Sequence, residues 1–461
     1  MAQQTVDAAD TSEFLRKRRR AILSAWAGFG MDSYSIYITT TVLLPAMIYF
    51  EGPNFTANDK SILTGMTLAA TLVGRPVGGM LFGHFADRMS RRTAGTITIL
   101  GFGTMSLLIG CLPGAATIGV GGAITLLLLL RFIEGIFLGG EYTAATPLAL
   151  EYAPAKHRGF LGSVIQCAAS VGPFVVAVVF TLVLQFAPNN GLNSPYVQWG
   201  WRIPFYIGFL LSVAVALFLR SQVEDSEMWK QAAAKRRADR SPLLELLKGK
   251  TRRSFLQAWG LMMGIFFVSN VVGSVGSQFL LKNPGFGASQ LAHTNLITPL
   301  PGAVAYVLMG WASDYIGRKR AFYIAGVVNL LVVPACMIAI GEGHVHGWAQ
   351  LTLLSVATFI ALGMLFGILP SYVNEQFATS VRSSGWGVAY GTAVIIPAFY
   401  SYYMVWLGHV MSFVWSAGLL VVVGVVILLI ATATGPETRG IELDSIQAEE
   451  EPVLPVSSQT G

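Results

Sequence analysis

The chain has 461 residues, of which 54% are hydrophobic and only 12% are charged, and it carries a formal net charge of +6 with a mean hydropathy of +0.60. A typical soluble domain has about 25% charged residues, so this composition excludes an ordinary water-soluble globular protein and indicates a chain solvated by lipid. The three cysteines, Cys111, Cys167 and Cys336, match no metal-binding or disulfide spacing, and we expect neither a metal nor a cofactor.

Twelve apolar runs of helical length follow one another along the chain. Each is long enough to cross the hydrocarbon core, which takes about 20 helical residues. Gly and Pro inside the runs are compatible with helix because neighbouring helices can satisfy the freed backbone groups. We therefore predict an all-α membrane protein with twelve transmembrane helices at 21–48, 61–86, 94–112, 123–150, 159–186, 202–220, 254–281, 292–313, 321–340, 350–373, 386–407 and 411–433.

The distribution of basic residues predicts how these helices are oriented. Of the 30 Lys and Arg residues, 25 fall on the side of the membrane that holds both termini, and only three fall on the other side. Because Lys and Arg are retained in cytoplasmic loops, both termini are expected in the cytoplasm. The first run follows the basic stretch 16–20 without a signal-peptide cleavage pattern. We expect a multi-pass protein of the plasma (inner) membrane.

An internal repeat divides the chain into two halves. The stretch GHFADRMSRR at 83–92 returns as GWASDYIGRK at 310–319, and an acidic residue seven positions before an arginine follows both the fourth and the tenth run. Such repeats are typical of transporters built from two related helical bundles. The predicted organisation is a cytoplasmic segment 1–20, a six-helix bundle 21–220, a cytoplasmic linker 221–253, a second six-helix bundle 254–434 and a cytoplasmic tail 435–461.

The repeated loop pattern resembles the signature of the major facilitator superfamily, as do RFIEGIFLGGEY (131–142) and GPETRG (435–440). Three further stretches, GRPVGGMLFGHFADR, WGWRIPFYIG and NEQFATSVRSSG, are similar to the metabolite–proton symporters of its sugar-porter-like branch. The first loop departs from the pattern at Ser90, where the family has glycine. The resemblance implies the major facilitator fold and alternating access, in which the two pseudo-symmetric bundles rock around a central site.

The resemblance also implies that the cytoplasmic loops act as a gate. Asp87 and Asp314 each end a helix beside a basic cluster, and such clusters can hold an outward-facing state and release when the halves rotate. The alternative is that these charges only mark the cytoplasmic boundary. The candidate gate residues are Gly83, Asp87, Arg88, Arg91, Arg92, Glu151, Arg158, Gly310, Asp314, Gly317, Arg318, Glu375 and Arg382.

Five ionisable residues lie inside the apolar runs, all in the first half: Asp32, Arg75, Arg131, Glu134 and Glu141. An intramembrane charge costs about 2.5–3.5 kcal/mol on insertion scales, so five together need a reason. At a rise of about 1.5 Å per residue, Asp32, Arg75 and Glu141 lie roughly 15–18 Å from the inner face, close to the midplane. Glu134 and Glu141 share one stripe of the fourth helix, which can face a cavity.

Arg75 must stay charged at this depth, so we expect it to be paired by Asp32, by Glu141 or by an anionic substrate. The alternative is a permanent structural ion pair that holds the first, second and fourth helices together. Glu134 has Arg131 three residues before it, which leaves Asp32 and Glu141 to compete for Arg75. We predict that a substrate anion on Arg75 displaces one carboxylate, which then takes a proton. Gln166, Asn270 and Tyr390 complete the candidate site, although Gln166 is equally compatible with a helix–helix hydrogen bond.

These patterns favour a secondary active transporter that takes up a small organic acid by proton-coupled symport. The alternatives are a sugar, polyol or zwitterion porter, a proton-driven exporter, or a nutrient sensor without transport. An enzyme is not expected, because neither the Gly-x-Ser-x-Gly nor the His-Glu-x-x-His pattern occurs. The absence of a Walker motif argues against ATP as the energy source, and Gly135, Gly139 and Gly140 suit close helix packing instead. We expect a monomer whose partners are the substrate, protons and lipid, with no nucleic acid.

Overall fold

The computed structural model describes residues 2–51, 55–88, 91–141, 150, 153–222, 246, 249–282, 286–377 and 381–443. Within these ranges the chain is helical and forms no strand. Of some helical residues, among them 83–88, 91, 92 and 141, only the backbone is described. The all-α prediction is confirmed.

The first half consists of six rods, counted over the described residues. The first rod extends through the π-helical turn η1 and shorter turns, and the fifth and sixth are also interrupted by irregular turns. The rods are α1 (Ala2–Tyr37) with η1 (Ile38–Leu43), α2 (Leu44–Ala46) and η2 (Met47–Tyr49); α3 (Ala57–Arg88); α4 (Arg91–Gly110); α5 (Ala115–Glu141); η3 (Ala155–His157), α7 (Arg158–Gln166), η4 (Cys167–Ser170) and α8 (Val171–Phe186); and η5 (Tyr196–Gly200) with α9 (Arg202–Gln222).

The second half has the same plan. Its rods are α12 (Gly249–Asn270), η6 (Val271–Val275) and α13 (Gly276–Lys282); α14 (Ala288–Ile297) and α15 (Pro299–Ile316); α16 (Arg318–Gly341); α17 (Trp348–Asn374); α18 (Arg382–Ala393), α19 (Ile395–Ala398) and α20 (Tyr400–Leu407); and α21 (Phe413–Thr434). The rods follow the twelve predicted runs with shifted ends. The largest shift is in α1, which begins well before residue 21 because its polar start continues the helix.

Nine helical stretches among the described residues are long and apolar enough to cross a membrane, and Gly95–Gly110 in α4 is a shorter apolar helix. The two remaining rods, α1 and α3, carry the charged residues Asp32 and Arg75. Asp32 and Arg75 therefore lie on rods that their neighbours must shield from lipid.

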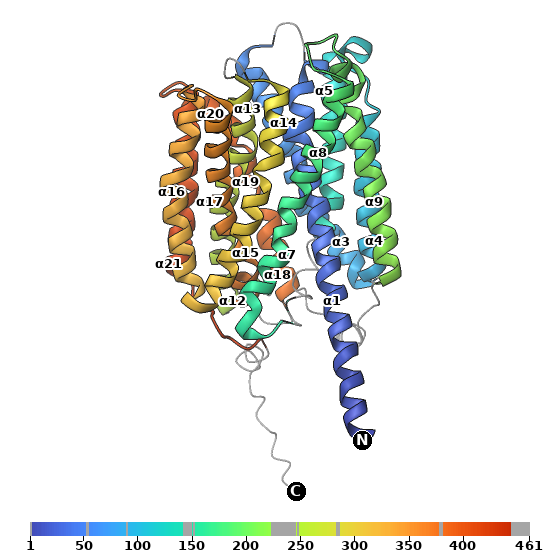
Figure 1. Cartoon of the computed structure of the whole chain (residues 1–461), viewed down its shortest axis with the longest axis vertical. Coiled ribbons are helices and arrows are strands. Elements are labelled where there is room, and N and C mark those ends of the chain that lie inside the picture. Colours follow the sequence, from blue (N-terminus) through green and yellow to red (C-terminus); the bar gives the residue numbers. More distant parts are fainter. Residues whose placement is uncertain are drawn as a thin grey trace.

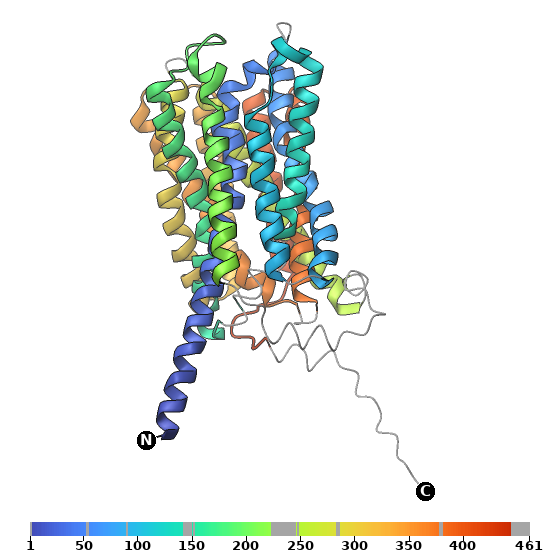
Figure 2. The same ribbon diagram turned by 90° about the vertical axis from the view of Figure 1, so that its right-hand side faces the viewer.

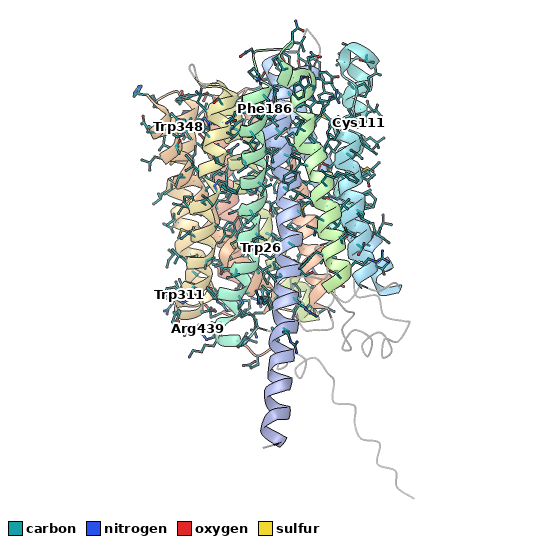
Figure 3. The ribbon with its side chains drawn as sticks, turned by 45° about the vertical axis from the view of Figure 1, so that its right-hand side comes forward. Trp26, Cys111, Phe186, Trp311, Trp348 and Arg439 are labelled. Atoms are coloured by element: carbon teal, nitrogen blue, oxygen red, sulfur yellow. The ribbon has the colours of Figure 1, made fainter. Side chains whose placement is uncertain are left out.

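The two halves lie side by side, with α1 to α9 on one side and α12 to α21 on the other (Figure 1). The rods run along the long axis of the molecule, and the start of α1 extends beyond the bundle (Figure 2). We call the end at which α1 begins and α21 ends the inner end, and the opposite end the outer end. Trp311 and Arg439 lie towards the inner end, whereas Phe186 and Trp348 lie towards the outer end (Figure 3).

Glycines allow α3 and α5 to pack with their backbones almost in contact. A Cβ atom on Gly135 would collide with the carbonyl of Thr71, and one on Gly139 would collide with the carbonyl of Arg75. The predicted role of Gly135 and Gly139 in close helix packing is confirmed. Because Gly139 faces the backbone of Arg75, this contact also fixes the position from which the Arg75 side chain extends.

Candidate functional site

A buried ion pair joins the first two rods near the centre of the molecule. Arg75 Nη2 on α3 donates to Asp32 Oδ1 on α1 at 2.6 Å. Each side chain is only 2% exposed. The structure thus brings together the two residues that were expected at one depth, and Asp32 neutralises the guanidinium that the apolar run could not otherwise accommodate.

A second buried pair lies on α5 and contacts α1. Arg131 Nη1 donates to Glu134 Oε2 at 2.6 Å, one helical turn away. Ser35 connects this pair to α1, because its hydroxyl donates to Glu134 Oε1 at 2.9 Å and its carbonyl accepts from Arg131 Nη2 at 3.3 Å. The expected pairing of Glu134 with the arginine three residues before it is confirmed, and Ser35 is an addition that the sequence did not suggest.

A cavity of about 70 Å³ lies beside the first pair and is lined by both halves. Its wall includes Asp32, Arg75, Gln166, Asn270 and Tyr390, which are five of the eight residues that the sequence proposed for the central site. These residues come from α1, α3, α7, α12 and α18.

Arg131 and Glu134 do not appear among the described residues that line the cavity. The expectation that this stripe of the fourth helix faces a cavity is therefore not met at Glu134. The reason is that Ser35 on α1 turns towards α5 and binds the pair there. Glu141, the third residue proposed on this helix, lies outside the residues whose side chains are described.

Two amide side chains in the cavity wall have buried atoms without a hydrogen-bond partner. Neither the Nε2 nor the Oε1 atom of Gln166 has a hydrogen-bond partner among the described residues, and Nδ2 of Asn270 also has none. A buried amide that lacks a hydrogen bond costs about 1–3 kcal/mol. A ligand in the cavity could satisfy both groups, one from each half of the protein.

Aromatic rings form much of the remaining wall. Tyr390 stands edge-on to Phe266, with ring centroids 4.9 Å apart, and Tyr306 lies 6.0 Å from Phe366. All four rings line the cavity, together with Tyr37 from the first half. The site therefore combines one charged pair, two amides with unpaired atoms and an aromatic surface, which suits a small ligand with a polar end and an apolar body.

Neutral hydrogen bonds join the two halves on the outer side of the cavity. Ser61 Oγ on α3 donates to Gln278 Oε1 on α13 at 3.2 Å. Asn295 Nδ2 on α14 donates to Thr41 Oγ1 in η1 at 3.1 Å. We call these two contacts the outer gate. Such bonds contribute about 0.5–1.5 kcal/mol each, so this closure is a weak one.

Charged groups join the halves at the inner end. Glu375 on α17 accepts from Arg158 on α7 at 3.3 Å and from Arg318 on α16 at 3.1 Å. All three side chains are almost completely buried. We call this cluster, together with Asp314, the inner gate. Because Glu375 binds one arginine from each half, the halves cannot separate here without breaking a buried ion pair.

Asp314 strengthens the same closure. Its carboxylate accepts from the backbone N–H groups of Gly159 and Phe160 at 2.9 Å each, at the first turn of α7 in the opposite half. It also binds Arg318 at 2.8 Å.

Two glycines of the repeated loop pattern shape the inner end of α15. Gly310 has no room for a side chain where α15 meets α7 at Ser163. Gly317 adopts a φ of +95°, which turns the chain sharply from α15 into α16.

The segment after α21 folds across the inner gate. Glu437 accepts from the backbone N–H groups of Arg318 and Lys319, at 2.8 and 3.1 Å, and so caps the start of α16. Thr438 donates to Glu375 at 2.7 Å, and Arg158 donates to the carbonyl of Ile441 at 2.9 Å. The end of the second half therefore contacts the first half directly.

The first copy of the repeated loop cannot be compared in the same way. The predictions for Glu151, for the packing around Gly83 and for the side chains of Asp87, Arg88, Arg91 and Arg92 lie outside what the structure describes. Arg382 is buried, and its Nε donates to the carbonyl of Phe377 at 3.1 Å.

Comparison with known proteins decides the family. The family described as "Sugar (and other) transporter" matches residues 21–251 and 222–449, which together span both halves. The chain belongs to this family. It is therefore a membrane transporter with several membrane-spanning helices, and not an enzyme.

Relatives of this transporter carry several different substrates. The alpha-ketoglutarate permease of Escherichia coli K12 is 29% identical over 458 residues, covering 95% of this chain and 100% of the permease. The shikimate transporter of the same organism is 28% identical over 389 residues, covering 83% of this chain and 86% of that protein. The inner membrane metabolite transport protein YhjE of Escherichia coli K12 is 27% identical over 394 residues, covering 83% of this chain and 86% of YhjE.

Solved structures show the fold of this transporter. The major facilitator superfamily proton:xylose symporter XylE, bound to 6-bromo-6-deoxy-D-glucose, superposes with a TM-score of 0.71 at 20% identity, covering 94% of this chain and 99% of XylE. A partially occluded, inward-open structure of XylE from E. coli has a TM-score of 0.67. The predicted twelve-helix major facilitator fold is confirmed, and the family match confirms the resemblance to sugar-porter-like transporters.

Sequence reasoning identified Tyr390 but missed the other aromatic residues of the cavity wall and the contacts of the segment after α21. A depth count would have identified Tyr306, because it lies eight residues before Asp314 and so roughly 12 Å from the inner end. The contacts of Glu437 and Thr438 carried no comparable signal, because a segment that follows the last helix can reach many loops.

Proposed function

We propose that this transporter takes up a small organic carboxylate together with a proton. The observation that carries the proposal is the Asp32–Arg75 pair in the wall of a cavity shared by both halves. Arg75 is the natural partner for a substrate carboxylate, since a guanidinium binds a carboxylate through two parallel hydrogen bonds. The Gln166 amide and the Nδ2 group of Asn270, which lack partners, would bind the rest of the substrate.

Proton coupling follows from the competition for Arg75. When the substrate carboxylate binds the guanidinium, Asp32 loses its partner while it remains buried. A buried carboxylate without a counter-charge takes up a proton, so substrate and proton enter together. We assign the proton to Asp32, because it is the carboxylate that binds Arg75 in the cavity wall. The relatives named for alpha-ketoglutarate and shikimate support the carboxylate, and the symporter XylE supports a proton as the coupling ion.

We propose an arrangement of the chain to match. Residues 21–220 and 254–434 form the rocking halves, 221–253 is the linker, and the inner end with both termini faces the cytoplasm, as the excess of Lys and Arg on that side indicates. The inner gate then closes the cytoplasmic side, and the outer gate opens to admit substrate. The protein would function as a monomer in the plasma (inner) membrane.

A zwitterion such as a betaine is the second candidate substrate. The aromatic rings of Tyr37, Tyr306 and Tyr390 can surround a quaternary ammonium group, and Arg75 can bind the carboxylate of the same molecule. A proline/betaine transporter of Salmonella typhimurium is 28% identical over 406 residues, covering 85% of this chain.

Uptake into liposomes tests both candidates. The purified protein is reconstituted, a pH gradient with an alkaline interior is imposed, and radiolabelled carboxylates, betaines and sugars are supplied singly. We expect concentrative uptake of a carboxylate that Arg75→Gln abolishes and the exposed outer-end variant Asp59→Asn preserves. Uptake of sugars alone, or carboxylate uptake that survives Arg75→Gln, contradicts the proposal. Uptake of betaines alone selects the second candidate.

A further inference from the structure

A second cavity lies far from the central site, on the outside of the second half. It is a groove of about 600 Å³ between the start of α12 and the end of α21, at the inner end. Figure 1 shows α21 at the edge of this half. Leu256 and Ile430, which line the groove, are 49% and 60% exposed. Apolar side chains exposed on the outside of a membrane-spanning bundle face lipid. We call this cavity the α12–α21 groove.

Two arginines stand at the inner mouth of the groove. Arg252 and Arg253 lie near the start of α12, are exposed, and have no acidic partner among the described residues. The first turn of this helix contains no acidic residue. The N-terminal end of a helix is already the positive end of its dipole, so two more positive charges there are unfavourable. An anion bound at this point would offset the charge of the two arginines and the positive end of the helix dipole, since helix N-termini and guanidinium groups both bind phosphate.

We propose that the α12–α21 groove binds one anionic phospholipid. The phosphate lies against Arg252 and Arg253, and an acyl chain follows the apolar wall past Leu256, Gly260 and Ile430. This combination of a basic mouth and an apolar floor distinguishes a phospholipid from a soluble anion, which would use only the mouth. In the proposed orientation the groove opens at the cytoplasmic leaflet, whose anionic lipids are attracted to basic residues near its surface.

The floor of the groove connects to the inner gate. Gln257 Nε2 donates to the carbonyl of Ala431 on α21 at 2.8 Å and to the hydroxyl of Tyr372 on α17 at 3.1 Å. The Tyr372 hydroxyl in turn donates to the carbonyl of Pro436 at 3.1 Å, in the segment that crosses the inner gate. A lipid that holds α12 against α21 therefore stabilises the segment whose contacts keep the inner gate closed.

Native mass spectrometry of the full-length protein tests the site. The protein is titrated with phosphatidylglycerol and, separately, with phosphatidylcholine of the same acyl chains. Two arginines near a membrane surface each contribute about fivefold to the binding of an anionic lipid. We therefore expect Arg252→Gln/Arg253→Gln to lower the association constant of one phosphatidylglycerol about 30-fold and to leave phosphatidylcholine unchanged. The matched control Arg220→Gln/Arg320→Gln removes two exposed arginines from the same end of the molecule and is expected to bind as the wild type does.

A second variant tests whether the lipid occupies the groove or is only attracted to the positive charge of the surface. Gly260→Leu keeps both arginines but fills the groove, and the position tolerates a side chain because a Cβ there meets only Ala431, at 3.6 Å. We expect it to weaken phosphatidylglycerol binding as well. Equal binding by the wild type and the double arginine variant overturns the proposal, and so does full binding by Gly260→Leu. A truncation after Leu443 removes four acidic residues, and stronger lipid binding by that shorter chain would mean that the tail, and not lipid, occupies the groove.

Discussion

Replacement of Asp32 by asparagine is expected to uncouple uptake from the pH gradient while leaving exchange of substrate intact. The substitution keeps the size of the side chain and removes the charge that binds Arg75 at 2.6 Å. The neutral amide cannot take up a proton when substrate binds, so the step that joins proton and substrate is lost. Arg75 remains available to the substrate carboxylate, and binding itself should persist.

The size of the effect follows from the proposed stoichiometry of one proton per substrate. A gradient of one pH unit is worth about 1.36 kcal/mol, or tenfold. With the membrane potential held at zero and a monocarboxylate as substrate, wild-type liposomes should therefore accumulate substrate about tenfold, and liposomes with Asp32→Asn should only equilibrate it. The apparent affinity of the wild type should fall as external pH rises, by up to about tenfold per unit, because one proton binds with each substrate. The apparent affinity of Asp32→Asn should not change with external pH.

The assay has a direct control and a clear contrary result. Uptake driven by the pH gradient is measured beside counterflow of labelled against unlabelled substrate, with Asp59→Asn as the matched neutral substitution at an exposed site. Tenfold accumulation by Asp32→Asn would refute the assignment of the proton to Asp32. If Glu141→Gln also kept full coupling, competition for Arg75 would be rejected as the coupling mechanism.

Three other substitutions test separate parts of the structure. Glu134→Gln leaves Arg131 buried without its carboxylate, and breaking such a pair costs about 3–5 kcal/mol; thermal unfolding in detergent should show a lower midpoint than for Asp59→Asn, and an unchanged midpoint would contradict the burial of the pair. Glu375→Gln should open the inner gate and raise the rate of maleimide labelling of a Ser163→Cys reporter by about tenfold or more, since Ser163 is fully buried where α7 meets α15. An unchanged labelling rate would show that Glu375 does not hold the gate. Gly139→Val should abolish folded protein, measured as the monodisperse fraction in size-exclusion chromatography, because a Cβ at this position collides with the α3 backbone; a normal yield would refute the close packing.

The charge pairs of the first half could be predicted because depth in a membrane can be counted along a helix. Asp32 and Arg75 lie at similar distances from the inner ends of their predicted apolar runs, and an apolar environment leaves a guanidinium few other partners. The pairing of Arg131 with Glu134 followed from their spacing within one helix. The direction in which the charged side chains of α5 point was harder to predict. Nothing in the sequence indicated that Ser35 on α1 would bind Glu134 outside the cavity.

The contacts between the halves could not be predicted from the sequence in the same way. Arg158 and Glu375 are 217 residues apart, and their contact depends on how two bundles dock in one of at least two conformations. The repeat placed both residues at the inner boundary but did not predict that Glu375 contacts Arg158 of the opposite half. The binding of Thr438 to Glu375 depends on the path of a single turn after α21.

The difference between the two gates has a consequence for the direction of transport. Opening the inner gate breaks the buried Arg158–Glu375 ion pair, whereas opening the outer gate breaks two neutral hydrogen bonds. If this ion pair adds about 2 kcal/mol to inward opening, the empty carrier exposes its site to the cytoplasm only about one thirtieth as often as to the exterior. The half-saturation concentration measured from the cytoplasmic side should then be higher by the same factor, so that scarce external solute is captured efficiently while the accumulated pool drains back slowly.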